Sequence, residues 1–561
     1  MAISKKLWIV IGVVIVVVAA GSVAGYELTK STKQDIVLYT WWATTGKVAL
    51  QHEIPAFEKA DPNYTVTQAI TTGGGGGNSI ANLLSKVKAG ETPAAFQTHM
   101  GPEMYSFVQD SPHGLSTFVN WTSDYNQNFS GKVISSTFEA GAMNGVLLSM
   151  PVEVHTMGLL YMNDTILHKY GLTPPTNVWQ LQNDTYALAK AGFNSAHGDA
   201  PWGISGAEGG WAQLQLWENN FLGIAGPKLY NEFTYGTLNM TNSTVSNYVN
   251  QTNLLFKNET NYDYSGWQSM SWNQMASEMI SGHVAFLTAG DFVTNYMYDF
   301  LNTTSYPVNG NNGHYVNNTT TPILVQSFPG THKYFVVNLD SVGVSTGSTQ
   351  AAAVKFVNYW TSPTGNKIWT QWKGISYYSG KSTSYYNTPE QAYMYNKLST
   401  TPTSDFVYAL SDGGLFAGPD STITGNLLNL QSQLNGTSNP SKYINQWTTS
   451  LKSQINGEMQ DWLSANSHNL GYLGFPGHPF GGYLPSWANS SYNLTGKGSR
   501  AVSSLGSVYH STGVVHSAAH SESNSPANGA AAVEYVTYNV SNVPHTNTNF
   551  KAVVVNNLKP N

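Results

Sequence analysis

Five consecutive glycines, Gly73 to Gly77, follow Thr71 and Thr72 and stand directly before a pattern typical of a helix. A glycine-rich loop at a helix N-terminus can hold a phosphate, because open backbone N–H groups and the helix dipole favour an anion. The Gly-Lys-Ser/Thr ending of phosphate-binding P-loops is missing here. The stretch therefore predicts a turn that either presents backbone and hydroxyl groups to a ligand or holds no ligand.

Acidic and imidazole side chains are the next groups that could carry chemistry. A glycosidase needs two carboxylates about 5 to 10 Å apart, and Glu153, Asp291 and Asp340 are candidates for such a pair or for hydrogen-bonding and capping roles. The sequence contains no G-x-S-x-G, H-E-x-x-H, Walker or EF-hand motif. Its histidines show no tight pair at metal-ligand spacing outside weak ones in the tail, so we expect no metal and no cofactor.

The elements that would position these groups follow an alternating pattern. We expect strands at 35–40 and 64–70 and helices at 50–59 and 78–89, the second helix capped by Asn78 or Ser79 and ended by Gly90. Similar alternation continues to about residue 360 and predicts α/β units around mainly parallel sheets. Helical segments then dominate to about residue 466.

Length and composition limit the class of protein. A chain of 561 residues exceeds what one hydrophobic core usually supports, so at least two packed units are expected. Only 10% of residues are charged, about half of the usual share. The net charge of -6 without a basic block argues against a nucleic-acid partner. Cysteine is absent, which excludes disulfides, zinc thiolate sites and a cysteine nucleophile.

The N-terminus indicates export. Lys5 and Lys6 precede a long apolar run that begins at Leu7, which is typical of an export signal or of a membrane anchor within residues 1–34. Many N-x-[ST] sequons, such as those at Asn163 and Asn183, agree with a glycoprotein, although a chain rich in Asn, Ser and Thr also produces them by chance. Scarce carboxylates suit an acidic medium, and we therefore expect a thermoacidophilic archaeal source.

Several segments together carry a resemblance to a known family. In chain order they are LYTWWATTGK, GETPAAFQTHMG, LLSMPVEVHTMGLLYMNDTILHKYGLTPPT, MSWNQMASEMISGHVAFLTAGDF, SFPGTHKYFVVNLDSVGVS and QWKGISYYSG. The chain resembles the extracellular sugar-binding proteins of ABC importers from about residue 35 to 465, and it is most similar to the glucose- and mannose-binding members. The tail from 467 to 561 has no counterpart, and its role is unknown.

The resemblance implies a two-lobed α/β fold of the periplasmic-binding-protein type II, with the sugar in the cleft between the lobes. It places residues 35–150 and 291–360 in the N-terminal lobe, and residues 151–290 and 361–466 in the C-terminal lobe. The glycine loop at 73–77 would then face a neutral polyol, with Thr72 and the glycine backbone toward its hydroxyls.

The resemblance also implies site residues. Trp41 and Trp42 would line the entrance, Trp272 would stack on the sugar, and Glu153 and His155 at the crossover would bind either the ligand or the hinge. The residues that would hydrogen-bond the sugar are Gln97, His99, Asp340, Lys373 and Asp412. Structural roles stay open for three of these residues: a core or cap role for His99, core packing for Trp42 and a turn cap for Asp340.

The chain departs from the family pattern at three places. Thr44, Thr45 and Gly46 stand where an acidic residue usually follows the Trp pair, and the usual G-D-W reads Gly290-Asp291-Phe292. Asp412 stands where close relatives have a histidine. These differences leave the identity of the sugar open.

The sequence thus predicts a cell-surface, membrane-anchored or secreted protein that binds a monosaccharide of the glucose or mannose class and delivers it to ABC permease subunits without performing chemistry. Two alternatives come from other classes. One is a secreted, acid-stable enzyme acting on glycosides, and the other is a structural surface glycoprotein.

Overall fold

The computed structural model describes residues 33–73, 76–139, 146–234, 238–308, 323–411, 422–434 and 437–454, all within one unit, residues 1–509. The apolar N-terminal run, Asp412 and the tail from 467 lie outside the described residues. Across the described ranges, every helix is too short or too polar to cross a membrane.

The first sheet begins with the predicted alternation. Strand β1 (Gln34–Thr40) is followed by α2 (Thr45–Ala60), β2 (Tyr64–Ile70) and α3 (Gly77–Lys88). Strands β3 (Ala95–His99), β4 (Ser149–Pro151) and β12 (Asp340–Val344) complete the order β2-β1-β3-β12-β4. As predicted, most of its strands run in one direction: β1, β2, β3 and β4 point the same way, and only β12, which enters from the other lobe, pairs antiparallel with β3 and β4.

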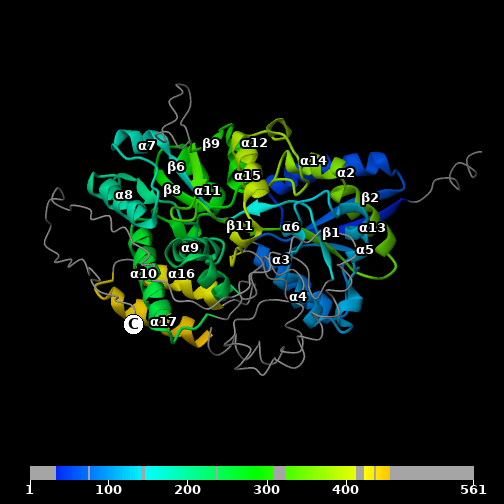
Figure 1. The fold of residues 1–561 in the computed structure, drawn as a ribbon, viewed down its shortest axis with the longest axis horizontal. Coiled ribbons are helices and arrows are strands. Elements are labelled where there is room, and N and C mark those ends of the chain that lie inside the picture. Colours follow the sequence, from blue (N-terminus) through cyan, green and yellow to red (C-terminus); the bar gives the residue numbers. More distant parts are fainter. Residues whose placement is uncertain are drawn as a thin grey trace, which may run out of the picture. The chain divides into compact units, whose positions relative to one another are not determined.

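Helices cover both faces of the first sheet. Helix α2 packs with α13 (Gln350–Thr361) and α14 (Pro363–Thr370), and α13 contacts β1, β4 and β12 (Figure 1). Helix α3 packs on α4 (Pro102–Asp110), which contacts β3. The buried Ile80, Leu83 and Val87 of α3 repeat at the expected helical spacing. The short helices α5 (Thr122–Asp124) and α6 (Ser135–Glu139) follow before β4.

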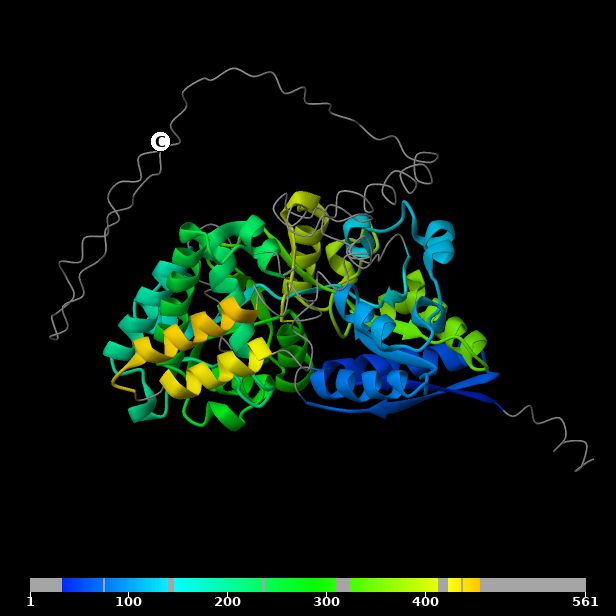
Figure 2. The ribbon, with the colours of Figure 1, turned by 90° about the horizontal axis from the view of Figure 1, so that it is seen from below.

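The second sheet has mixed strand directions as well. Its order is β7-β8-β6-β10-β9, built from β6 (Leu159–Asn163), β7 (Ala200–Trp202), β8 (Val284–Ala289), β9 (Ser305–Pro307) and β10 (Ile323–Ser327). Figure 2 shows the helices that surround this sheet. They are α7 (Asp164–Lys169), α8 (Val178–Lys190), α9 (Trp211–Thr234), α10 (Ser243–Thr260), α11 (Trp272–Ile280), α12 (Phe292–Leu301), α15 (Pro389–Thr400), α16 (Thr422–Leu434) and α17 (Pro440–Ser453).

A small third sheet joins the two larger ones. Its order is β13-β11-β5, formed by β5 (His155–Thr156), β11 (Phe335–Asn338) and β13 (Phe406–Tyr408). Strand β5 follows β4 of the first sheet and precedes β6 of the second, whereas β11 follows β10 of the second and precedes β12 of the first. The chain therefore crosses between the sheets on neighbouring antiparallel strands, with His155 opposite Asn338.

The sheets divide the chain differently from the predicted lobes. Strands at 305–307 and 323–327, assigned to the N-terminal lobe with 291–360, belong to the second sheet. Helix α14 at 363–370, assigned to the C-terminal lobe, packs on α2 beside the first sheet. Hydrophobic periodicity identifies a strand but not the sheet that it joins, which explains this difference. The remaining boundaries stay a prediction.

The glycine loop differs from the expectation in its cap. Helix α3 begins at Gly77 after Gly76, whose φ of 100° suits glycine, and no side chain caps its first turn. Asn78 instead donates from Nδ2 to the carbonyl of Thr72 at 3.2 Å and so closes the loop on itself. Gly90, with φ 80°, follows the end of the helix as predicted.

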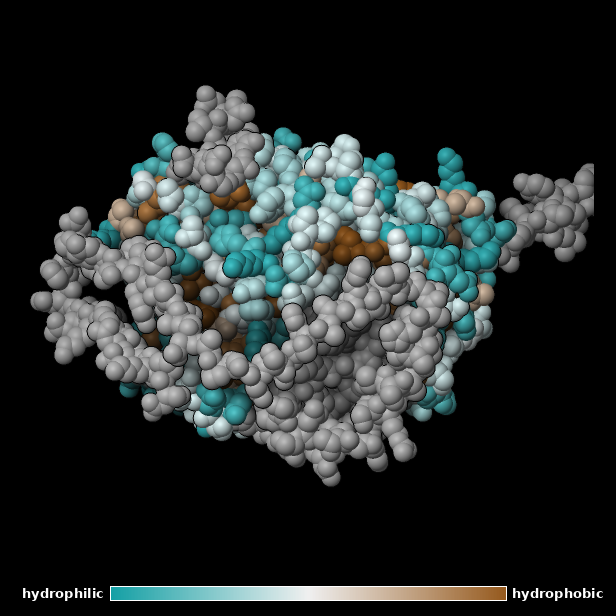
Figure 3. Space-filling model, viewed as in Figure 1, coloured by the Kyte–Doolittle hydropathy of each residue, from teal (hydrophilic) through white to brown (hydrophobic). Residues whose placement is uncertain are grey.

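The surface is polar, as the composition predicts. The face shown in Figure 3 is mostly hydrophilic, with small apolar patches. The two sequons named above differ in accessibility, because Asn183 is exposed whereas Asn163 is buried. Asn163 caps α7 through Oδ1 and donates to the carbonyl of Met279, so a glycan on Asn163 does not fit the folded chain.

Candidate functional site

A cavity of about 330 Å³ lies where elements of both large sheets meet. This volume is at the small end of ligand pockets, which run from about 300 to 1,000 Å³. Its aromatic lining consists of Trp41, Trp42, Trp211, Trp272 and Phe292. Its polar lining includes Thr45, Thr72, His99, Glu208, Ser271, Asn273, Asn338, Asp340 and Lys373.

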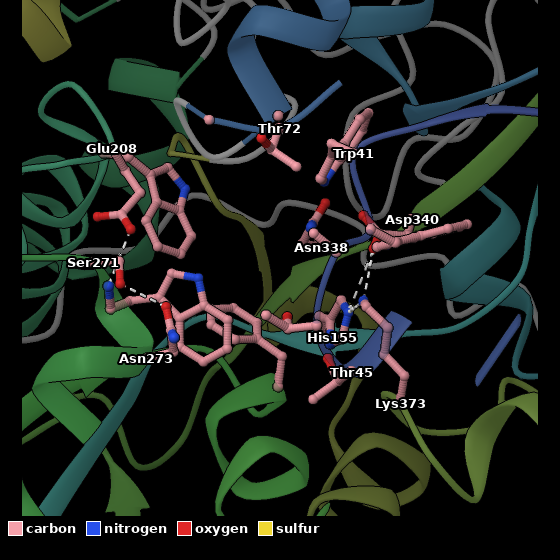
Figure 4. Close-up of a pocket in the computed structure, with 18 of the residues that line it drawn as sticks. Trp41, Thr45, Thr72, His155, Glu208, Ser271, Asn273, Asn338, Asp340 and Lys373 are labelled. Carbon is pink, nitrogen blue, oxygen red and sulfur yellow. Dashed lines mark hydrogen bonds and ion pairs between the residues drawn. The ribbon is translucent and has the colours of Figure 1, made fainter. Parts of the chain in front are cut away.

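Trp41 and the glycine loop form one wall, on the same side as Thr72 in Figure 4. The Trp41 ring lies 5.1 Å from the ring of His99. A Cβ atom on Gly76 would approach the Trp41 indole to 2.8 Å, closer than atoms in contact allow. The contact with Trp41 therefore explains the glycine at position 76 without a bound phosphate.

The neighbouring Trp42 supports the floor of the cavity. Its ring packs against Trp360 and Trp369, with centroids 5.6 and 4.8 Å away, so that it belongs to the core as well as to the cavity lining. Its Nε1 donates to Asp340 Oδ2 at 3.1 Å. Strand β12 places Asp340 opposite His99 of β3, and His99 Nε2 lies 3.4 Å from Asp340 Oδ1.

A buried ionic cluster continues from Asp340. Lys373, in the turn after α14, donates from Nζ to Asp340 Oδ2 at 2.8 Å and to Glu153 Oε1 at 2.5 Å, and it contacts His155 Nε2. Glu153, His155 and Asp340 are of residue types that bind metals, and their potential ligand atoms lie within 4.8 Å of one another. The ammonium of Lys373 already contacts all three, so the cluster has its own cation.

Neighbouring charges in the cluster shift the pKa values of Asp340 and Lys373. Burial opposes ionisation of Asp340, but Lys373 and a hydrogen bond with His155 outweigh it and hold the pKa of Asp340 well below its ordinary value. Burial likewise lowers the pKa of Lys373, yet Asp340 and Glu153 raise it on balance. The cluster therefore keeps an anionic carboxylate and an ammonium at the cavity.

Helix α11 supplies the opposite wall. Trp272 is its first residue, and its ring meets those of Phe292 and Tyr296 edge to face at 4.9 and 5.2 Å. The backbone N–H of Trp272 donates to Glu208 Oε1 at 3.0 Å, and burial raises the pKa of Glu208. Ser271 caps the helix in a capping box with Gln274, which fixes the first turn that carries Trp272 and Asn273.

The structure brings most of the predicted site residues together. Those that line the cavity are Trp41, Trp42, Thr72, His99, His155, Trp272, Asp340 and Lys373. Gln97 is buried behind it, accepting from the hydroxyl of Thr40 at 2.5 Å and from the backbone N–H of Trp41 at 3.1 Å. Glu153 is also behind it, accepting from Trp369 Nε1 at 2.8 Å. Asp412 lies outside the described residues, and the direct roles of all these residues stay predictions.

The three carboxylates that were candidates for a catalytic pair do not all reach the cavity. Asp340 lines the cavity, whereas Glu153 and Asp291 are not among its lining residues. Asp291 Oδ1 lies 2.5 Å from His155 Nδ1, deep in the crossing region. A hydrolytic pair built from these three residues therefore lacks its second member at the cavity.

Several lining residues escaped the sequence analysis. Glu208 and Trp211 lie in the segment GAEGGWAQ, whose glycines before a helix were a usable signal. Asn273 and Asn338 are one and two residues from Trp272 and Asp340. Phe292, noted as a departure from G-D-W, packs on Trp211 at 5.7 Å and keeps an aromatic ring at the cavity.

This arrangement suits reversible binding of a small polar ligand. Flat rings can cover the apolar C–H face of a ring-shaped polyol, and amides, hydroxyls and charged groups can direct hydrogen bonds to its rim. Figure 4 shows Glu208, Ser271 and Asn273 on one side and Asp340, His155 and Lys373 on the other.

Sequence comparisons agree with this geometry. A family model described as bacterial extracellular solute-binding protein matches residues 40–367. The chain is 41% identical over 464 residues to the glucose-binding protein GlcS of Saccharolobus solfataricus, covering 82% of this chain and 80% of that protein. It is 26% identical over 298 residues to an uncharacterized ABC transporter extracellular-binding protein of Pyrococcus horikoshii, covering 52% of this chain and 64% of that protein.

Solved structures share the fold at low identity. A chitin oligosaccharide binding protein aligns with a TM-score of 0.59 at 15% identity over 76% of this chain and 100% of that chain. The bacterial solute receptor AcbH aligns with a TM-score of 0.58 at 13% identity over 76% of this chain and 100% of that chain. The two-lobed fold predicted from sequence is confirmed. By fold and by sequence, this chain belongs to the family of bacterial extracellular solute-binding proteins.

Proposed function

We propose that this protein is the cell-surface solute-binding component of a sugar ABC importer and that it captures a monosaccharide of the glucose or mannose class. The observation that carries the proposal is the small cavity lined by aromatic rings and by converging amide, hydroxyl and charged groups. Such a lining matches the alternating apolar and polar faces of a pyranose.

The similarity to the glucose-binding protein of Saccharolobus solfataricus supports the choice of sugar. Thr44 and Thr45 line the cavity at the place where the family pattern leads one to expect an acidic residue, so part of the specificity is this chain's own. A carboxylate can only accept hydrogen bonds from sugar hydroxyls, whereas a threonine hydroxyl can also donate one to a sugar oxygen.

Partners and location follow from the same proposal. The loaded protein delivers the sugar to the permease subunits of the importer, and the N-terminal segment serves as its export signal or membrane anchor. Closing of the lobes around the sugar favours the conformation that the permease recognises, a population shift set by the difference in affinity between open and closed states. The protein performs no reaction on the sugar and binds no nucleic acid.

Titration calorimetry against a panel of sugars tests the proposal. We expect one saturable site for glucose or mannose, and weaker binding of xylose, maltose and raffinose. Absence of binding to every monosaccharide in the panel would refute the proposal. Release of reducing sugar from oligosaccharides would instead favour the glycoside-active enzyme, and self-assembly without sugar binding would favour the structural glycoprotein.

Metal removal gives a separate test. Because Lys373 already contacts Glu153, His155 and Asp340, the three residues of metal-ligand type, sugar affinity should stay the same after dialysis against EDTA. The measurement is the dissociation constant for glucose before and after dialysis, and a tenfold or greater loss that added divalent cation reverses would contradict this assignment.

A further inference from the structure

Lys373 has as many protein partners as it has N–H groups to donate. An ammonium carries three donors. Two go to Glu153 Oε1 at 2.5 Å and to Asp340 Oδ2 at 2.8 Å, and the third faces His155 Nε2. Lys373 lines the cavity, yet in this arrangement it has no donor left for a ligand.

The third contact requires one protonation state of His155. Nε2 can accept from Lys373 only when it carries no proton. His155 Nδ1 lies 2.5 Å from Asp291 Oδ1 and donates to that carboxylate. The arrangement thus corresponds to a neutral imidazole with its proton on Nδ1, as assigned from the hydrogen-bond partners.

The same atoms also accommodate an imidazolium. His155 Nε2 lies 3.1 Å from Glu153 Oε1 and 3.6 Å from Asp340 Oδ2, so a protonated Nε2 has an acceptor within reach. A protonated Nε2 cannot accept from Lys373, whose third N–H must then turn to another acceptor. The cavity offers the place for such an acceptor, because Lys373 lines it.

Charged and titratable groups face His155 from every element packed around it. They are Glu153 on its own segment, Asp291 at the start of α12, Asp340 of β12, Lys373 after α14 and Glu390 of α15. Burial lowers the pKa of His155, and Glu153 and Asp291 outweigh it, so that the pKa lies well above its ordinary value despite Lys373. Burial raises the pKa of Glu390 well above its ordinary value.

We propose that His155 controls whether the third N–H of Lys373 is available to the ligand, so that binding of a polyol in the cavity is accompanied by uptake of one proton at His155. The inference rests on the proposed function, since a sugar hydroxyl is the acceptor that competes with Nε2. The proton comes from the solvent and binds to the Nε2 lone pair that Lys373 releases. His155 is therefore a positioning residue that acts through Lys373.

Proton uptake at His155 makes sugar affinity depend on pH in one direction. The ligand removes a donor that stabilises neutral His155, so the pKa of His155 is higher in the complex than in the free protein. The complex then holds more protons between the two pKa values, and affinity falls as pH rises through that window, by at most about tenfold per pH unit. Because the free pKa is already raised, the window lies above the ordinary histidine range.

The test is titration calorimetry with D-glucose across about pH 6 to 10, around and above the ordinary histidine pKa, with two buffers of different ionisation enthalpy at each pH, such as phosphate and Tris near neutrality. The difference in heat between buffers gives the number of protons taken up. We expect uptake that approaches one proton within the window, and none for His155→Gln. His283→Gln is the matched control, because His283 also pairs with a carboxylate, Glu278 at 2.8 Å, but is exposed and outside the cavity.

A second variant covers the case in which His155→Gln does not fold. Asp291→Asn removes a carboxylate that raises the pKa of His155, so the window of proton uptake should move to lower pH. Glucose binding by the wild type without proton exchange at any pH would overturn the inference and leave the proposed function standing. Proton uptake that persists in His155→Gln would also overturn it. Failure of glucose and of every other monosaccharide to bind would refute the proposed function itself.

Discussion

Trp272 and Asp340 contribute to the cavity by different physical means. Trp272 is half-buried and lines the cavity, so it offers ring area to a ligand. Asp340 is held ionised by Lys373 and is a strong acceptor for hydroxyl groups. Stacking and charge-assisted hydrogen bonds are each worth roughly 1.5 to 3 kcal/mol in a closed site.

We therefore expect Trp272→Ala or Asp340→Ala to weaken sugar binding at least about tenfold, at 1.4 kcal/mol per decade. Calorimetry on variants with unchanged circular dichroism measures this loss. Trp179→Ala is the control, because Trp179 is exposed on α8 and does not line the cavity. The site assignment would be wrong if both variants fold and bind glucose as tightly as the wild type.

Residue type and position within a motif were enough to predict most of the residues of the candidate site. Eight of the predicted residues line the cavity. The sequence could not show which residues on one face of a strand reach the cavity. Gln97 and His99 share one face of β3, but the backbone of Trp41 covers Gln97. Glu208 could not be ranked from the sequence, because its relation to Trp272 depends on a contact across 64 residues.

At the scale of elements, the glycines on either side of α3, Gly76 and Gly90, can be compared directly. Gly76 and Gly90 both have positive φ, 100° and 80°, but only at Gly76 would a Cβ atom meet another group, the Trp41 indole. Gly76→Ala should shift this ring and weaken sugar binding by tenfold or more, an order-of-magnitude expectation for a displaced aromatic contact. Gly90→Ala carries the same backbone strain and should leave affinity nearly unchanged.

Affinity and thermal stability measured for both variants separate the two effects. Equal losses of affinity in Gly76→Ala and Gly90→Ala would show that backbone strain, and not contact with Trp41, gives this loop its importance.

The fold was predictable where local pattern decides it. Strands β1 and β2 and helices α2 and α3 lie where alternation and helical spacing placed them. Sheet membership depends on long-range pairing, and it was missed at β9 and β10. The cap of α3 was missed because Asn78 bonds backward to Thr72.

At the scale of the whole molecule, buried carboxyl groups make the free energy of unfolding depend on pH. Burial raises the pKa values of Glu53, Glu259, Asp263 and Glu390 well above their ordinary range. A carboxyl whose pKa is raised by folding holds its proton in the folded state, so its stabilising contribution is complete below the unfolded pKa and is lost as pH rises through the folded pKa. Asp340 has the opposite sign, because its pKa is lowered.

Glu259→Gln tests this dependence on one group. Glu259 accepts from Asn220 Nδ2 at 2.6 Å, and the oxygen of an amide can keep that bond. The variant should unfold at higher urea concentration than the wild type at about pH 7 and at a similar concentration near pH 4, close to the ordinary pKa of a glutamate. A larger gain at the lower pH would show that the sign is wrong.

Truncation tests how much of the chain the site needs. The lining residues of the cavity fall between Trp41 and Lys373. Removing residues 467–561 should therefore leave the dissociation constant for glucose within a factor of a few. A truncated protein that folds but no longer binds would mean that the tail contributes to the site.

The place of β12 in the first sheet has a consequence for how the chain is made. It lies between β3 and β4, although it is synthesised about two hundred residues after them. Until residues 340–344 emerge, the early part of the sheet ends in two unpaired edges, which are sites for aggregation. Completion of the first lobe must wait for the second to be synthesised, so folding should be slow and depend on long-range pairing. An exported chain of this kind therefore depends on what protects those edges while its later half is still crossing the membrane.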